Sequence, residues 1–164
     1  EQLQYYLASL YEKEKEYGLS YSILEKILEK NPNNAHALNF LGYSMVDRDY
    51  KIDEGKAFIE KAISLRPKDG FIRDSLGWYY FKIKEYSKAL KELSQAWSLV
   101  KTDTVISKHL AMTYEKLKKY NLAKKYYLEA LKHCKIDSQK KEISEALENL
   151  KSYKKEKTRL PAAN

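Results

Sequence analysis

The chain has 164 residues, of which 33% are charged, and its formal net charge is +8. Five Gly and three Pro are too few for the turns of an all-β fold, and no apolar run approaches the roughly 20 residues that span a bilayer. Lys, Glu, Leu, Ala and Tyr dominate, and most of these residues favour helices. The composition therefore predicts an all-α fold without a transmembrane segment.

Amphipathic helical segments follow one another along the chain in pairs. We predict helices near 2–15 and 19–31, 35–48 and 53–66, 70–83 and 86–99, and 104–117 and 120–133. Breaks are marked by Gly18, "NPNN" (31–34), "RPKDG" (66–70) and "KTDT" (101–104). A last helix is predicted over 138–153, where Ile143, Ala146, Leu147 and Leu150 share one face, and 154–164 is predicted to be a flexible basic tail.

The helix pairs repeat one another with a period of about 34 residues. A Leu followed by a small residue recurs in register, as Leu7-Ala8, Leu41-Gly42, Leu76-Gly77 and Leu110-Ala111. Four residues after each Leu comes a large apolar or aromatic side chain, namely Tyr11, Met45, Tyr80 and Tyr114. Small residues recur farther on at two columns, and Pro32 and Pro67 close the first two units.

This pattern resembles the tetratricopeptide repeat (TPR), over about residues 1–137. The resemblance implies a right-handed superhelical solenoid with repeats at 1–34, 35–69, 70–103 and 104–137, closed by a capping helix at 138–153. The segment from Asn39 to Leu90 also resembles the C-terminal repeats of long bacterial TPR proteins, many of which are exported or associated with the cell envelope. That likeness points to the envelope or periplasm, with the cytoplasm as the alternative.

Gly77 lies inside a predicted helix, where it costs about 1 kcal/mol relative to Ala. We interpret it as the point where the two helices of one repeat approach most closely, so that a larger side chain would overpack the contact. The first repeat has no cap before it, and Leu3, Leu7 and Leu10 have no upstream neighbour to cover them. We therefore expect either further repeats upstream or self-association through this end.

No catalytic motif or phosphate-binding loop is present, so the sequence does not predict an enzyme. Cys134 is the only cysteine, and the three His residues share no metal-ligand spacing with it. We expect no metal and no cofactor.

The TPR resemblance implies a protein-interaction scaffold that holds a peptide or partner segment in a concave groove lined by the first helix of each repeat. The expected groove residues are Tyr5, Asn39, Tyr43, Asp74, Trp78, Phe81, Lys108 and Met112. Aromatic side chains of this kind are typical of interface hot spots, and Trp78 is expected to be the central one. The Lys/Asn/Arg clamp of chaperone-binding TPRs is missing from the matching columns, so a chaperone tail is not the expected ligand.

Positive charge gathers in the fourth repeat, where residues 104–137 hold eight Lys and three acidic residues. Around the predicted turn lie Lys116, Lys118, Lys119, Lys124 and Lys125. The alternative function is therefore a basic surface that binds an acidic partner, an anionic lipid or nucleic acid. Few arginines and no RNA-binding motif accompany these lysines, which disfavours nucleic acid.

Overall fold

The computed structural model describes the backbone of residues 2–157 and the side chains of residues 2–150. The chain divides into two compact units, Glu1–Leu99 (unit 1) and Val100–Asn164 (unit 2). Within the described residues all regular structure is helical, as expected.

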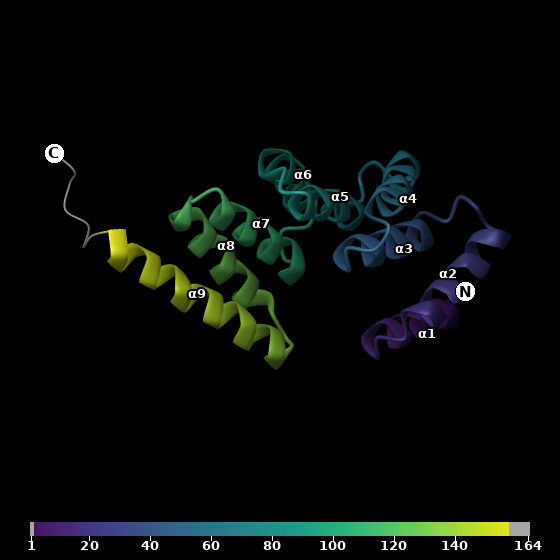
Figure 1. Ribbon diagram of the computed structural model, residues 1–164, viewed down its shortest axis with the longest axis horizontal. Coiled ribbons are helices and arrows are strands. Elements are labelled where there is room, and N and C mark those ends of the chain that lie inside the picture. The colour runs from purple at the N-terminus through teal and green to yellow at the C-terminus, as the bar shows by residue number, and fades with distance from the viewer. Residues whose placement is uncertain (1, 158–164) are drawn as a thin grey trace. The chain divides into compact units, whose positions relative to one another are not determined.

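Unit 1 consists of three antiparallel helix pairs that follow one another along the chain (Figure 1). The helices are α1 (Gln2–Lys13), α2 (Tyr17–Lys30), α3 (Ala35–Asp47), α4 (Ile52–Leu65), α5 (Gly70–Lys82) and α6 (Tyr86–Leu99). Gly18 was expected to mark a break, but it lies in the first turn of α2, where its φ is not positive.

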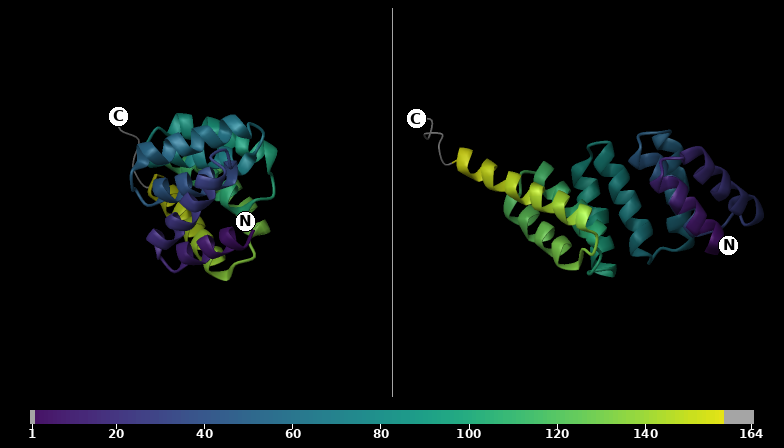
Figure 2. Two further views of the ribbon diagram at one scale, coloured as in Figure 1. Left: turned by 90° about the vertical axis from the view of Figure 1, so that its right-hand side faces the viewer. Right: turned by 90° about the horizontal axis from the view of Figure 1, so that it is seen from below.

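Unit 2 contains one helix pair and a longer final helix, which is seen along its length in Figure 2. Its helices are α7 (Thr104–Lys116), α8 (Tyr120–His133) and α9 (Asp137–Lys157). The prediction that the flexible tail begins at residue 154 is wrong, because α9 continues to Lys157. The segment "KSYKKEK" contains no Gly or Pro that would end a helix. Residues 158–164 of the predicted tail lie outside the described part of the chain.

Side-chain caps and left-handed turns set the ends of the helices. Asp69 and Asp103 each accept hydrogen bonds from the first backbone N–H groups of α5 and α7, and Asn34 does the same for α3. The first helix of each pair ends in a left-handed residue, respectively Lys15, Asp49, Lys84 and Lys118. These residues stop the helices one or two positions earlier than predicted.

The core forms where the two helices of a pair approach and where one pair meets the next. A Cβ added to Gly77 would lie 2.5 Å from Leu93 Cγ on α6, which confirms the expected close approach. Ala8, Leu24 and Ile27 of the first pair pack with Leu41 and Met45 of α3. In unit 2, Ala123, Tyr127 and Ala130 pack against Ile143 and Leu150 of α9.

None of the helices in the described part of the chain is both long enough and apolar enough to cross a membrane.

Candidate binding site on the first helices

Six of the expected groove residues lie in unit 1, on its first helices α1, α3 and α5. Tyr5, Asn39, Tyr43 and Phe81 are partly exposed there. Asp74 and Trp78 on α5 are buried, with exposed fractions of 5% and 8%. The partly exposed side chains are therefore the ones through which unit 1 could contact a partner.

Trp78 lies in the joint between the second and third helix pairs rather than open to solvent. Its Nε1–H donates to Asp47 Oδ1 at 2.8 Å, and its ring stacks on Phe81 with centroids 4.7 Å apart. Lys82 strengthens the same joint, because its Nζ donates to the Asp47 carbonyl and to Asp49 Oδ2, each at 2.8 Å. Trp78 thus holds α3 and α5 together, which its column in the repeat did not reveal.

Tyr43 lies on α3 among carboxylates from three helices. Burial raises the pKa of its phenol far above the usual value, and the charges of Asp47, Asp74 and Glu12 raise it further. The phenol is therefore neutral across the physiological pH range.

Two buried acceptor atoms near the α1–α3 joint have no hydrogen-bond partner among the described residues: Glu12 Oε2 and Asn39 Oδ1. The other carboxylate oxygen of Glu12 accepts a hydrogen bond from Ser44 Oγ at 2.6 Å. A buried acceptor without a partner costs about 1–3 kcal/mol. A donor from a bound molecule would remove that cost.

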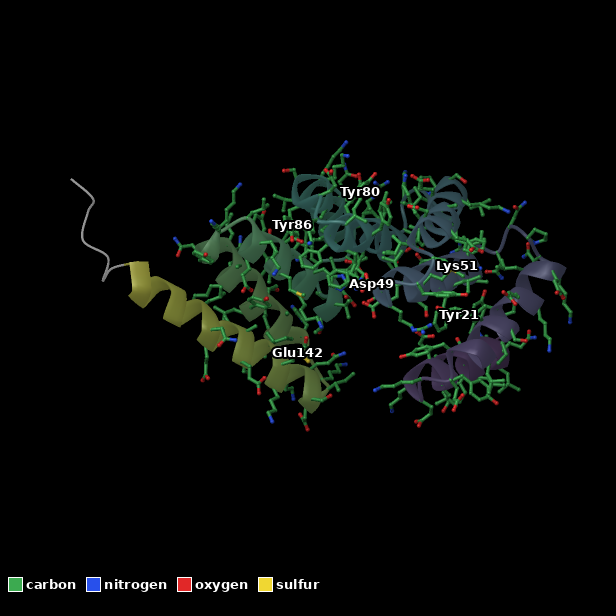
Figure 3. The ribbon with its side chains drawn as sticks, in the orientation of Figure 1. Tyr21, Asp49, Lys51, Tyr80, Tyr86 and Glu142 are labelled. Atoms are coloured by element: carbon green, nitrogen blue, oxygen red, sulfur yellow. The ribbon has the colours of Figure 1, made fainter. Side chains whose placement is uncertain are left out.

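A cluster of tyrosines around Arg48 was not foreseen from the sequence. The guanidinium lies 3.4 Å from the ring centroid of Tyr17 and donates to the Tyr21 hydroxyl at 3.1 Å. Tyr21 projects from α2 and lies 3.1 Å from Ser44 Oγ, which links the cluster to Glu12 (Figure 3). The only sequence signal was the i, i+4 spacing of Tyr17 and Tyr21 on α2.

A pocket of about 510 Å³ lies between the start of α1 and the start of α3. Tyr5, His36 and Arg66 are among the residues that line it. The Tyr5 hydroxyl donates to Asn34 Oδ1 at 2.6 Å, so this predicted groove residue also connects the first two helix pairs.

Lys108 and Met112, the other two expected groove residues, belong to unit 2. Lys108 Nζ lies 3.2 Å from Glu142 Oε1 on α9, and Met112 packs against the apolar cluster of that unit. Glu142 is labelled in Figure 3. The contacts of both side chains thus tie α7 into unit 2.

The predicted basic surface lies around the turn between α7 and α8. All five of its lysines are exposed, and none makes an ion pair within the described part of the chain: Lys116, Lys118, Lys119, Lys124 and Lys125. Its nearest carboxylate along α7, Glu115, accepts a hydrogen bond from the Tyr127 hydroxyl at 2.9 Å. The lysine charges of this surface are therefore available to a partner.

Comparison with known families and proteins decides the type of repeat. A tetratricopeptide repeat family model matches residues 109–132, which cover most of α7 and α8. A TPR repeat-containing protein of Pseudomonas aeruginosa is 35% identical over 94 residues. This chain is a tetratricopeptide repeat protein. The aligned stretch covers 57% of this chain but only 16% of that relative.

Solved TPR-type structures confirm the all-α helical-repeat fold. The pilF protein of Pseudomonas aeruginosa matches with a TM-score of 0.66 and 19% identity, covering 98% of this chain and 76% of its own. The first TPR domain of Spaghetti (RPAP3), solved with an HSP90 peptide, matches with a TM-score of 0.64 and 20% identity, covering 73% of this chain and 91% of its own. The TPR fold makes this chain a protein-interaction scaffold.

Proposed function

We propose that the scaffold binds an extended or helical segment of a partner protein on the first-helix face of unit 1, through Tyr5, Asn39 and Tyr43. The observation that carries this proposal is the pair of unpartnered acceptors, Glu12 Oε2 and Asn39 Oδ1, beside these partly exposed side chains. Backbone N–H groups or a cationic side chain of the partner supply the missing donors.

The roles of the face residues follow from their burial. Tyr43 contributes contact area and a neutral hydroxyl, because its ionisation is suppressed. Asp74 and Trp78 position α5 rather than contacting the partner directly, since both are buried. The partner is not a chaperone tail, because Tyr5, Ser9, Phe40, Phe71 and Ser75 stand in the columns of the carboxylate clamp.

A selection from a random peptide library displayed on phage, with this chain as bait, tests the proposal without a known partner. Selected peptides should bind Asn39→Ala and Tyr43→Ala at least about tenfold more weakly, as expected for hot-spot truncations. Trp78→Ala is a poor probe, because it also breaks the joint with Asp47. The matched control is Lys118→Glu/Lys119→Glu, which changes charge on the other unit and should leave peptide affinity unchanged.

A second candidate function is the basic surface of repeat 4, favoured by its five exposed lysines without ion pairs. Its ligand would be an acidic protein, an anionic lipid or nucleic acid. In that case Lys118→Glu/Lys119→Glu abolishes binding, affinity falls steeply as salt rises, and Asn39→Ala has no effect. That combination of results would reject the first-helix face as the working surface.

A further inference from the structure

One apolar stripe recurs on several helices of this chain, at positions i, i+3, i+4 and i+7. On α3 it consists of Ala37, Phe40, Leu41 and Ser44. On α5 it consists of Ile72, Ser75, Leu76 and Tyr79, and on α9 of Ile143, Ala146, Leu147 and Leu150. The same positions of α1 hold Leu3, Tyr6, Leu7 and Leu10, which we name the open stripe.

The stripe of α3 is the surface with which this helix contacts the preceding helix pair. Ala37 and Leu41, exposed by 0% and 1%, pack in one cluster with Leu24 and Ile27 of α2. Ser44 donates to Glu12 of α1 at 2.6 Å and lies 3.1 Å from the Tyr21 hydroxyl. The stripe thus fixes how one repeat is seated on the repeat before it.

The stripes of α5 and α9 are covered in the same way, each within its own unit. Ile72 of α5 packs against Leu38 and Ala62 of the second helix pair. Ile143 and Leu150 of α9 pack against the fourth pair, mainly through small and aromatic side chains of α8. A helix pair that covers a stripe therefore presents Ala together with branched or aromatic apolar residues.

The open stripe of α1 is bare. Its side chains have exposed fractions of 77% for Leu3, 62% for Tyr6, 40% for Leu7 and 38% for Leu10. Four large apolar side chains in contact with solvent on one helix form a patch of the kind that marks an interaction surface.

We propose that the open stripe is seated on a further TPR-type helix pair that precedes α1 in the same polypeptide, in the geometry in which α1 and α2 cover α3. This inference concerns an interface separate from the proposed partner site. The three covered stripes supply the chemistry of the occupant: an Ala-rich helix pair with branched apolar side chains. A second copy stacked head to tail is disfavoured, because α9 already covers the matching surface of the fourth pair.

A fusion tests the proposal directly. A copy of residues 35–69 is placed immediately before residue 1, which occupies the register of residue 70. The copied pair presents the surface that seats Ile72. We expect the backbone amides of α1 to exchange at least about tenfold more slowly in the fusion than in the original chain, because they open less often once the stripe is covered.

The matched control is the same fusion with Leu3→Glu/Tyr6→Glu, which should return the exchange of α1 to its original rate. A second fusion with a copy of residues 1–34 guards against poor folding of the first, and the proposal is wrong if neither fusion slows exchange in α1. It is also wrong if the unfused chain sediments as a stable dimer that Leu3→Glu/Tyr6→Glu disperses, since the occupant would then be a second copy.

Discussion

Single atoms decide how closely the helices of each pair approach one another. At one column of the repeat stand Ala8, Gly42, Gly77 and Ala111. A Cβ on Gly42 would lie 2.6 Å from the carbonyl oxygen of Gly55, which belongs to the backbone and cannot turn away. At Gly77 the obstacle is the Leu93 side chain, which has some freedom to move.

Gly42→Ala should therefore lower the free energy of unfolding by about 1–3 kcal/mol, as overpacking does in other cores. Gly18→Ala is the matched control: a Cβ there meets nothing within 4 Å, so the better helix propensity of Ala should stabilise the chain by up to about 1 kcal/mol. Urea denaturation of both variants measures the difference. Equal stability of Gly42→Ala and the parent would refute the close approach of α3 and α4.

Tyr43 should make stability depend on alkaline pH. Its pKa in the folded chain is raised by burial and by three carboxylates, whereas in the unfolded chain it returns to about 10. Below pH 10 both states hold the proton; above it only the unfolded state releases it, so stability falls by about 1.4 kcal/mol per pH unit for this group. Lysines titrate in the same range, so the reference is Tyr43→Phe.

Denaturant unfolding of the parent and of Tyr43→Phe at pH 9 and pH 11 isolates this contribution. The parent should lose more stability than the variant over that interval. Parallel losses in the two proteins would mean that the phenol is as free to ionise in the folded state as in the unfolded chain.

At the scale of the elements, the sequence predicted the helix pairs well because apolar spacing and small residues are local signals. The ends of the helices were less predictable, since Lys15, Lys84 and Lys118 take a left-handed conformation that usually favours Gly. The role of Trp78 was also hidden: its hydrogen bond to Asp47 joins residues 31 positions apart and depends on how two repeats meet. For the same reason the Arg48 cluster, which joins α2 to the end of α3, could not be read from its column.

The turn after α5 offers a test of this backbone conformation. Lys84 has φ of 64°, and the N–H of Glu85 returns to the Tyr80 carbonyl at 2.9 Å. Because a left-handed conformation costs a residue with a Cβ roughly 1–2 kcal/mol and Gly little, Lys84→Gly should stabilise the chain by about 0.5–1 kcal/mol after the entropy cost of Gly. Lys91→Gly, at an exposed site inside α6, should instead destabilise it by about 1 kcal/mol. Thermal unfolding of the two variants should move in opposite directions.

At the scale of the whole molecule, stability in a repeat protein is a sum of local terms, because each repeat contacts only its neighbours. The chain shows this organisation in its separate apolar clusters, each of which joins one helix pair to the next element. The cap α9 should consequently support the fourth pair and have little influence on the first two.

Ile143→Ala tests how far the influence of the cap extends. Ile143 is 1% exposed and packs among Ala123, Tyr127 and Ala130, so its truncation should cost about 2–5 kcal/mol in the stability of unit 2. Hydrogen exchange should become faster in α7–α9 while the amides of α1–α4 keep their rates. Glu145→Ala, on the exposed side of the same helix, is the control and should change neither. Faster exchange along the entire chain in Ile143→Ala would show that the repeats unfold as one cooperative block, and the assumption of local terms would then fail.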